Sequence, residues 1–403
     1  IYFVMSHTAP MYSHIQHILD EVSLITRENL SGVRVIRAFN QQDNEQKRFE
    51  STTTKQKEEQ IIAGNLSAVL NPATTIIVNF GIIAILYISG FKINAGSMTQ
   101  GEVISLINYM NQILLSMYVF ANVIVILNKA SASYKRCADV LSQKPDIVQG
   151  INEAPSDYQN LITYDHVSFS YYSGNALTDV SFNIFPGQTI GVIGGTGSGK
   201  TTLINLIPRF YDVAEGEIRI KELPIKSYKF KDLRNMIGIV PQQATLFGGT
   251  IRENMQWGHP HATDEEIYEA LELSQSKEFV DKMTKGLDTY IEQGGKNVSG
   301  GQRQRLTIAR ALVKKPEILI LDDSASALDF ATDAKLRKAL STLNMTVIIV
   351  SQRVSALMHA DSIVVLSHGE VVGQGTHDML MNTCDVYQEI VMSQMEGGQN
   401  NEE

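Results

Sequence analysis

Two long stretches of the chain carry no charged side chain and are apolar enough to be membrane spans. They are residues 60–91 and 103–128, and each exceeds the roughly 20 apolar residues that a helix needs to cross a bilayer. The first contains the run TTIIVNFGIIAILYISG, which is apolar on nearly all sides and lacks the polar face of a surface helix. The short link between them, KINAGSMTQGE, predicts a helical hairpin. A pair of buried core helices in a large soluble protein is the alternative.

The charges around these stretches predict their orientation. Lys and Arg are more frequent on the outer flanks than in the link, which places both outer flanks in the cytoplasm. The second stretch is interrupted by the polar residues Asn108, Asn111, Gln112, Ser116 and Asn122. Such side chains at membrane depth face either a wet cavity or a neighbouring helix, and both interpretations stay open. Two spans are too few to enclose a pathway, so we expect further helices from sequence outside this chain or from a partner.

The segment before the first span has a helical pattern with one break. Residues 11–59 are helical in pattern, and the break falls at Gly32 in NLSGVRVIRAFN. Arg34 and Arg37 predict a short apolar and basic helix there, below the membrane, which could press on a cytoplasmic domain. An ordinary amphipathic turn is the alternative.

The composition changes after the second span. Residues 141–160 are mixed polar with two prolines and predict a linker. Short β-runs then alternate with helical stretches, which predicts a mostly parallel sheet covered by helices. We therefore expect a membrane part at 1–140, an α/β domain at 161–395 and a disordered polar tail at 396–403.

Bulk properties exclude some classes of protein. The net charge of −9 over 403 residues gives no indication of a nucleic-acid partner. Cys137 and Cys384 lie too far apart in a long chain to predict a disulfide framework. The opening IYFVMSHTAP has no initiator Met and is not a convincing signal peptide, so we expect residues upstream.

The strongest motif is TIGVIGGTGSGKTTLINLI, an apolar strand followed by a glycine-rich loop and a helix. It fits the phosphate-binding loop G-x-x-x-x-G-K-[ST]. Glycines let backbone N–H groups converge on phosphate oxygens, and the start of the helix adds its positive dipole end. Lys200 would reach the β- and γ-phosphates, and the Thr201 hydroxyl would bind Mg²⁺. The predicted nucleotide-binding residues here are Gly194, Gly195, Thr196, Gly197, Ser198, Gly199, Lys200, Thr201 and Thr202.

Two further segments contain residues that could act on a bound phosphate. In ILILDDSASALD a buried strand ends in two carboxylates, and Asp322 would hold Mg²⁺ while Asp323 could polarise an attacking water. In NVSGGQRQRLTIARAL a Ser-Gly-Gly turn opens an amphipathic helix and forms a second anion site. One nucleotide would not need both sites. The pair therefore indicates two domains that close head-to-tail, each offering its second site to the other's nucleotide.

With these motifs the sequence resembles the ATP-binding cassette (ABC) exporters from about residue 25 to 394. IVPQQATLF looks like the Q-loop, whose Gln242 contacts Mg²⁺ and the attacking water in the family. The segment SALD at 326–329 matches the D-loop. In VSFSY, Tyr171 stands where the family stacks an aromatic ring on adenine, with core packing as the alternative. VSGGQ resembles the LSGGQ signature with Val instead of Leu, and its expected contacts to a partner's ATP are Ser299, Gly300, Gly301 and Gln302.

The resemblance also implies an architecture. It implies a partial α-helical membrane domain followed by an α/β P-loop NTPase domain of ABC type with a helical subdomain. NLSGVRVIRAF is similar to the coupling helix that docks on the opposite cassette. The two spans would be the fifth and sixth membrane helices of a six-helix half, of which the first three and most of the fourth are absent. The metal would be held by Thr201, Gln242 and Asp322.

Three positions depart from the family pattern. Asp323 replaces the usual catalytic Glu, Gln352 replaces the His of the switch, and Glu292-Gln293 stand where Gly-Glu is frequent. This is similar to the degenerate subunit of heterodimeric bacterial multidrug exporters. It implies a bacterial inner-membrane, multi-pass protein with a cytoplasmic nucleotide-binding domain that binds ATP and Mg²⁺. Its own site would be slow, and its signature would complete the site of a second exporter half. A sluggish homodimer is the alternative.

Other functions remain to be weighed against export. A soluble P-loop ATPase of the chromosome-maintenance or DNA-repair type shares the signature, but it would need long coiled coils and no bilayer-length runs. A non-transporting regulator could use the slow site as an ATP sensor. The substrate of an exporter is left open among drugs, lipids and peptides.

Overall fold

The computed structural model describes residues 2–153, 155, 158–171, 174–324 and 328–399, apart from some side chains in the long helices and in the last helix, including that of Asn122. The chain divides into two compact units, Ile1–Gln143 and Lys144–Glu403, and each is described by itself.

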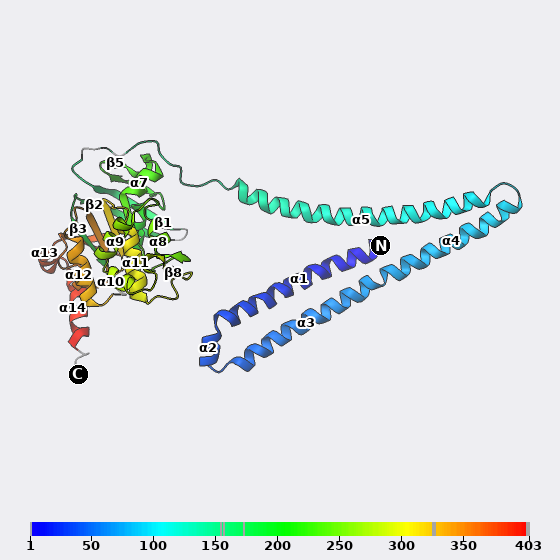
Figure 1. The fold of residues 1–403 in the computed structure, drawn as a ribbon, viewed down its shortest axis with the longest axis horizontal. Helices are drawn as coiled ribbons and strands as arrows, with labels where there is room; N and C mark the ends of the chain where they lie inside the picture. The colour runs from blue at the N-terminus through cyan, green and yellow to red at the C-terminus, as the bar shows by residue number, and fades with distance from the viewer. Residues whose placement is uncertain (1, 154, 156–157, 172–173, 325–327, 400–403) are drawn as a thin grey trace. The chain divides into compact units, whose positions relative to one another are not determined.

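The first unit is helical. Its helices are α1 (Tyr2–Ser31), α2 (Val33–Ala38), α3 (Gln42–Ala68), α4 (Leu70–Asn94) and α5 (Gln100–Ser142). Helices α1 and α3 lie side by side (Figure 1). Ile18 and Ile25 of α1 are buried, as is Ala63 of α3, and Arg48 of α3 pairs with Glu28 of α1 at 3.2 Å. The ion pair is about half exposed and contributes at most about 1 kcal/mol, so the apolar contacts hold the two helices together.

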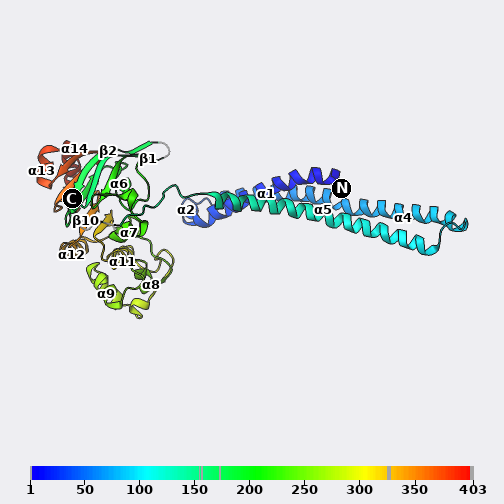
Figure 2. The same ribbon diagram turned by 90° about the horizontal axis from the view of Figure 1, so that it is seen from above.

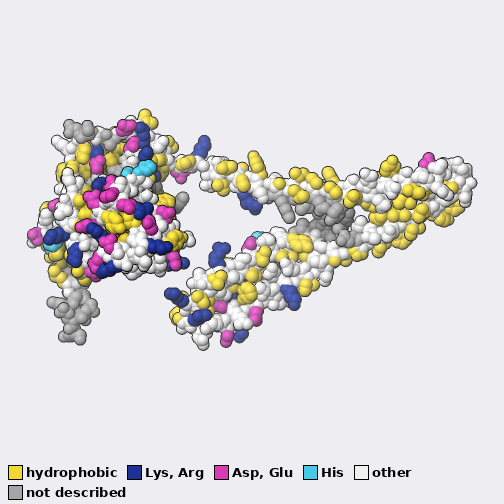
Figure 3. Space-filling view, in the orientation of Figure 1, with side chains coloured by type: hydrophobic (Ala, Val, Ile, Leu, Met, Phe, Trp, Pro, Cys, Tyr) yellow, Lys and Arg dark blue, Asp and Glu magenta, His cyan; other side chains and the backbone are white. Residues whose placement is uncertain are grey.

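Helices α4 and α5 form the predicted hairpin. Their loop ends at Thr99, whose side chain accepts a hydrogen bond from the backbone of Glu102 in a capping box that starts α5. Hydrophobic side chains dominate the surface of the hairpin, while charged ones gather at the α1–α3 end (Figure 3). Among the described residues, the helical stretch Gln42–Asn94 is long and apolar enough to cross a membrane. The predicted first span lies in this stretch; the second, within α5, stays a prediction.

The second unit is built on a six-stranded sheet of order β12-β11-β3-β10-β9-β6. Its strands are β12 (Glu370–Gly375), β11 (Ser362–Ser367), β3 (Thr189–Gly194), β10 (Thr346–Val350), β9 (Ile318–Asp322) and β6 (Ile237–Val240). Only the edge strand β12 runs antiparallel to its neighbour. Every residue of β9 is buried, as continuous apolar runs are in parallel sheets. The predicted parallel sheet is therefore confirmed, and the carboxyl ends of β3, β9 and β10 share one edge.

A second, antiparallel sheet was not predicted. Its order is β2-β1-β4-β5, from strands β2 (Gly174–Ile184), β1 (Ile162–Tyr171), β4 (Glu215–Ile220) and β5 (Leu223–Pro224). Tyr164 of β1 is buried, stacks on Phe182 at 4.5 Å and donates its hydroxyl to the carbonyl of Leu203. The two sheets share one hydrophobic core, which fixes β1 and β2 beside the phosphate loop.

The expected helical subdomain is inserted between β6 and β9. It contains α8 (Ile251–Gln256), α9 (Asp264–Leu273), α10 (Lys277–Asp281) and α11 (Gly300–Leu312), with a small two-stranded antiparallel sheet of β7 (Gly249–Thr250) and β8 (Tyr290–Ile291). These helices group around their own core, away from α13 and α14 (Figure 2). The remaining helices are α6 (Lys200–Leu206), η1 (Ile225–Ser227), α7 (Phe230–Met236), η2 (Gly286–Asp288), α12 (Phe330–Leu340), η3 (Val354–Ala356), α13 (His377–Thr383) and α14 (Asp385–Gln399).

The two segments predicted to be irregular, the linker and the C-terminal tail, are partly ordered. The first residues of the predicted linker 141–160 are the end of α5, and its described middle part is held on the second unit, where the Gly150 N–H donates to the Tyr228 carbonyl at 2.9 Å and Glu153 pairs with Lys229 at 3.0 Å. Helix α14 continues to Gln399, so the first residues of the predicted tail 396–403 are helical, and the last lie outside the described part.

A substitution at Gly150 tests whether the linker is held in this way. A Cβ at Gly150 would overlap the backbone of Ser227, whereas a Cβ at Gly174 would meet open space. We expect Gly150→Val to speed cleavage after Glu153 by a glutamate-specific protease severalfold, because the linker loses its backbone hydrogen bonds. The matched Gly174→Val should cleave at the wild-type rate. Equal cleavage of both variants would contradict the docked linker.

Candidate nucleotide-binding site

The glycine-rich loop between β3 and α6 wraps around the ammonium group of Lys200. The Lys200 Nζ donates to the carbonyls of Gly194 at 2.8 Å and Gly195 at 2.6 Å. Gly199 has a left-handed φ of +99°, and a Cβ there would lie 2.6 Å from the Ala176 carbonyl of β2. Only glycine meets both conditions, so the turn into α6 depends on this residue.

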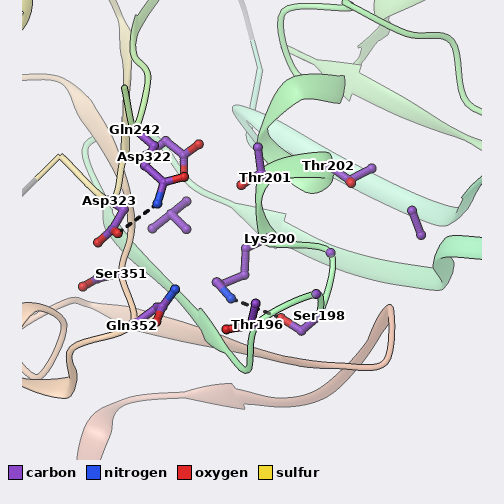
Figure 4. Close-up of a pocket in the computed structure, with 14 residues that line it drawn as sticks. Thr196, Ser198, Lys200, Thr201, Thr202, Gln242, Asp322, Asp323, Ser351 and Gln352 are labelled. Atoms are coloured by element: carbon purple, nitrogen blue, oxygen red, sulfur yellow. Dashed lines mark hydrogen bonds between the residues drawn. The ribbon is translucent and has the colours of Figure 1, made fainter. Parts of the chain in front are cut away.

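Beside the loop lies a cavity of about 320 Å³ (Figure 4). Its walls come from the phosphate loop, the carboxyl ends of β9 and β10, and the loop after β6. The lining residues are Ala176, Thr196, Gly197, Ser198, Gly199, Lys200, Thr201, Thr202, Gln242, Asp322, Asp323, Val350, Ser351 and Gln352. The structure thus brings together most residues that the sequence singled out. Gly194 and Gly195 instead hold Lys200.

One cation and two carboxylates are among the described side chains that line this cavity. Burial lowers the pKa of Lys200, and the nearby Asp322 and Asp323 raise it in part. Burial also raises the pKa of Asp322, as does Asp323, while a hydrogen bond with Thr201 and the charge of Lys200 lower it. A buried carboxylate beside a second one is a favourable place for a cation.

Asp323 is held in an unusual backbone conformation. Its φ is +44°, in the left-handed region that residues with a Cβ rarely adopt, and its N–H donates to the Val350 carbonyl at 2.9 Å. Its Oδ2 accepts from the Gln242 Nε2 at 3.3 Å (Figure 4). The backbone therefore fixes the direction in which this carboxylate leaves the strand, and the predicted water-polarising residue meets the Q-loop residue.

Gln352 and Tyr171 differ in their relation to the cavity. Gln352 lines the cavity from the loop after β10 and is exposed. Tyr171 is not one of the described residues that line the cavity. Its ring packs edge-on against Phe169 and Tyr211, and its hydroxyl lies 3.5 Å from the Thr202 Oγ1. Adenine stacking on Tyr171 stays a prediction.

Comparison with known proteins decides the family. Residues 1–117 match the model of the ABC transporter transmembrane region, and residues 177–326 match that of the ABC transporter ATP-binding domain. The chain is 39% identical over 395 residues to YfiB of Bacillus subtilis, an uncharacterised ABC transporter ATP-binding protein, covering 97% of this chain and 69% of that one. The chain belongs to the ABC transporters.

Two more similarities refine this assignment. The chain is 35% identical to YheI of Bacillus subtilis, a probable multidrug resistance ABC transporter ATP-binding/permease protein, covering 90% of this chain and 63% of that one. A solved bacterial Atm1-family ABC exporter with ATP bound superposes with a TM-score of 0.85 at 25% identity, covering 98% of this chain and 70% of that chain. The fold is therefore that of an ABC exporter, a helical membrane region followed by a nucleotide-binding domain, and the family implies ATP hydrolysis.

The cavity of this ABC domain fits Mg²⁺ and ATP. Magnesium is usually held by one or two carboxylates together with substrate phosphates. Within the described residues there is no cluster of three or more His, Cys, Asp and Glu residues that could hold a metal ion. Asp322, Thr201 and Gln242 line the cavity and would supply oxygen ligands, and Lys200 would supply a cation for the phosphates.

The ABC signature lies elsewhere in the same unit. Ser299 caps α11: its Oγ accepts from the Gln302 N–H at 3.2 Å, and the Gln302 Oε1 accepts from the Ser299 N–H at 3.0 Å. Among the described residues, none from Ser299 to Gln302 lines the cavity. In the D-loop, Ser326 and Ala327 fall outside the described residues, while Asp329 caps α12 by accepting from the Thr332 N–H.

The sequence missed some residues of this site. Ala176, Val350 and Ser351 line the cavity, and Tyr211 packs against Tyr171. Ala176 and Tyr211 belong to no motif, whereas Val350 and Ser351 directly precede the switch residue Gln352 but were not singled out. Ser351 and Val350 could have been found from the parallel sheet, because the residues after neighbouring strands meet at one edge. Ala176 and Tyr211 depend on the antiparallel sheet, which the sequence did not reveal.

The raised pKa of Asp322 predicts a pH-dependent cost to stability. A carboxyl group whose pKa is higher in the folded chain than in the unfolded chain stabilises the folded state fully at pH values below the unfolded pKa. This stabilisation is lost as the pH rises through the folded pKa. At neutral pH, Asp322→Asn should therefore raise the melting temperature of the nucleotide-free chain by about 2 °C. Calorimetry of both chains at several pH values measures this.

The same variant should lose the stabilisation that Mg²⁺ adds to that of ATP. An Asp322→Asn chain that melts below the wild type at neutral pH would contradict the raised pKa, and one that gains as much from Mg²⁺ would contradict the assignment of Asp322 as the metal acid.

Proposed function

We propose that this chain is the energy-coupling half of a heterodimeric ABC exporter with one slow nucleotide site. ATP binding closes the two cassettes head-to-tail, coupling helices turn the membrane helices outward, and hydrolysis resets them. The chain's own loop forms the slow site with the partner's signature. Its Ser299–Gln302 segment completes the competent site on the partner.

One observation carries this proposal: Asp323 and Gln352 line the same cavity as Lys200 and Asp322. The side chain of Asp323 is one methylene shorter than Glu, so its carboxylate lies about 1.5 Å nearer the backbone. A displacement near 1 Å can cost on the order of 100-fold in a geometry-sensitive step. The Asp323 carboxylate still accepts a hydrogen bond from Gln242 at 3.3 Å. This supports a site that keeps the negative charge of the usual glutamate but has a carboxylate of shorter reach.

The amide of Gln352 supports the same conclusion independently. A neutral amide donates and accepts hydrogen bonds, but it cannot carry a proton as histidine can. Gln352 can thus contact a phosphate without acting in proton transfer. Together the two residues suit a site that retains ATP. When bound, Mg²⁺ supplies charge neutralisation at the phosphates, and Thr201, Asp322 and Gln242 orient it.

The exposed apolar residues around α2 support its role as the coupling helix. In the described part of α2 no residue is buried, and Val35 and the adjoining Phe39 are 61% and 72% exposed. Arg34 and Arg37 add positive charge on the same short helix. A six-residue helix gains little from its own hydrogen bonds, so a docking partner would account for its apolar surface.

The membrane part supports a multi-pass protein of the bacterial cell membrane with the nucleotide-binding unit in the cytoplasm. On α5, Gln112 and Ser116 line an open hollow of about 540 Å³ together with the aromatic rings of Tyr109 and Phe120. Amides and rings on one face suit amphipathic molecules better than small ions. Several similar proteins carry names of multidrug export, such as one of Staphylococcus aureus that is 35% identical. We therefore propose drugs as substrates, with lipids and peptides as the alternatives.

Two substitutions in the heterodimer separate the two sites. Ser299→Ala should reduce ATP turnover about tenfold or more, because it removes the helix cap that shapes the signature of the competent site. Asp323→Ala should reduce turnover by less than about threefold, since it alters only the slow site. Turnover is measured with the partner half in lipid. Equal losses in both variants would show that Asp323 works as an ordinary catalytic base.

Restoring the family residues tests the slow site directly. Asp323→Glu combined with Gln352→His should raise turnover at this site by about tenfold to 100-fold, because reach and proton transfer both return. The measurement uses a partner whose own phosphate-loop lysine is replaced by alanine. The matched control is Asp323→Gln with Gln352→His, which has the length but not the charge. An unchanged rate in the restored chain would mean that other residues limit the site.

A further inference from the structure

A side chain from the C-terminal helix holds the backbone of the loop that carries Gln352. The Nε2 of Gln394 in α14 donates to the Gln352 carbonyl at 2.6 Å, and its Oε1 accepts from the Val354 N–H at 2.9 Å. Only one orientation of the amide satisfies both contacts, because the other would place donor against donor and acceptor against acceptor. The three residues thus form a specific clasp between distant parts of the chain.

The rest of this loop is held by other elements. The Ser351 Oγ accepts from the Arg353 N–H at 3.0 Å, and Arg337 of α12 donates to the Ala356 carbonyl at 2.6 Å. The Ser351 contact lies within the loop and binds the N–H of the peptide group that joins Gln352 to Arg353. Gln394 binds the carbonyl of that same peptide group from α14, and so ties the position whose amide lines the nucleotide cavity to another element.

We propose that Gln394 is a positioning residue for the nucleotide site and acts through Gln352. This rests on the proposed role of Gln352 at the phosphates. With the clasp, the backbone at residues 352–354 is already ordered, and the Gln352 amide enters the cavity from a fixed point. Without it, binding of ATP must order this loop, and affinity falls. The docking of α14 is thereby coupled to the grip on ATP.

The same helix offers a matched control. Gln388 also donates its Nε2 to a backbone carbonyl, that of Met381 at 2.8 Å, and Met381 belongs to α13 rather than to the loop. Gln394→Ala and Gln388→Ala each remove an amide from one face of α14. They should lower the melting temperature similarly, but only the first removes a contact to the loop.

The test measures Mg-ATP affinity of the full chain in detergent by displacement of a fluorescent ATP analogue. We expect Gln394→Ala to weaken binding about threefold to tenfold and Gln388→Ala less than about twofold. In a chain that already carries Gln352→Ala, adding Gln394→Ala should change affinity by less than about twofold, since the side chain that transmits the effect is gone. Unchanged affinity in Gln394→Ala, or effects that multiply in the double variant, would overturn the proposal.

A second variant keeps the test decisive if the alanine chain folds poorly. Gln394→Glu retains an acceptor for the Val354 N–H and loses the donor to Gln352 until the glutamate is protonated. Its deficit relative to wild type should shrink as the pH falls toward the pKa of that glutamate; a pH-independent deficit would contradict the clasp. Full-rate hydrolysis by a homodimer would end the heterodimer proposal but leave these affinity comparisons valid.

Discussion

The second unit depends on the enclosure of one ammonium group by the loop that precedes it. Lys200 is buried, and its Nζ binds the carbonyls of Gly194 and Gly195 while Asp322 and Asp323 stand across the cavity. Burying these charges costs free energy, which the carbonyl contacts and the opposite charges offset in part. Because this cost is offset only in part, the site favours binding of a polyanion together with a metal ion. The sheet order serves this arrangement, since it brings the ends of β3, β9 and β10 to one edge.

Two residues at that edge carry the proposed loss of hydrolysis. Asp323 still presents a carboxylate, which accepts from Gln242, and it lies at a left-handed backbone position directly after the strand. Gln352 likewise keeps hydrogen-bonding capacity. In the proposed heterodimer, a site with these two residues would still close on ATP and so still report occupancy to the coupling helices. Slow hydrolysis there would prolong the closed state, which suits a site that works by binding while its counterpart turns over.

The sequence predicted those elements that depend on contacts between residues close together in the chain. The phosphate loop, the buried strand of Asp322 and the helix opened by the Ser-Gly-Gly turn at Ser299 each depend on neighbours within a few residues, and the structure has these elements where the sequence indicates them. The antiparallel sheet was missed because its strands follow a mixed pattern with register shifts at the bulges of β1. The approach of Ala176 to Gly199 and the docked linker at Gly150 were missed for the same reason: both depend on pairings between distant segments.

The clasp of Gln394 belongs to this non-local class and indicates where the regulation of such a site can reside. The motifs of an ABC domain specify which groups meet the nucleotide, but the rigidity of those groups comes from contacts outside the motifs. The loop of Gln352 is restrained by α12, which follows the D-loop, and by α14 near the end of the described chain. Because both helices hold the same short loop, a shift in either one changes the entropy that ATP binding must remove. The grip on ATP can therefore be tuned from the C-terminal helix while every residue of the phosphate loop stays the same.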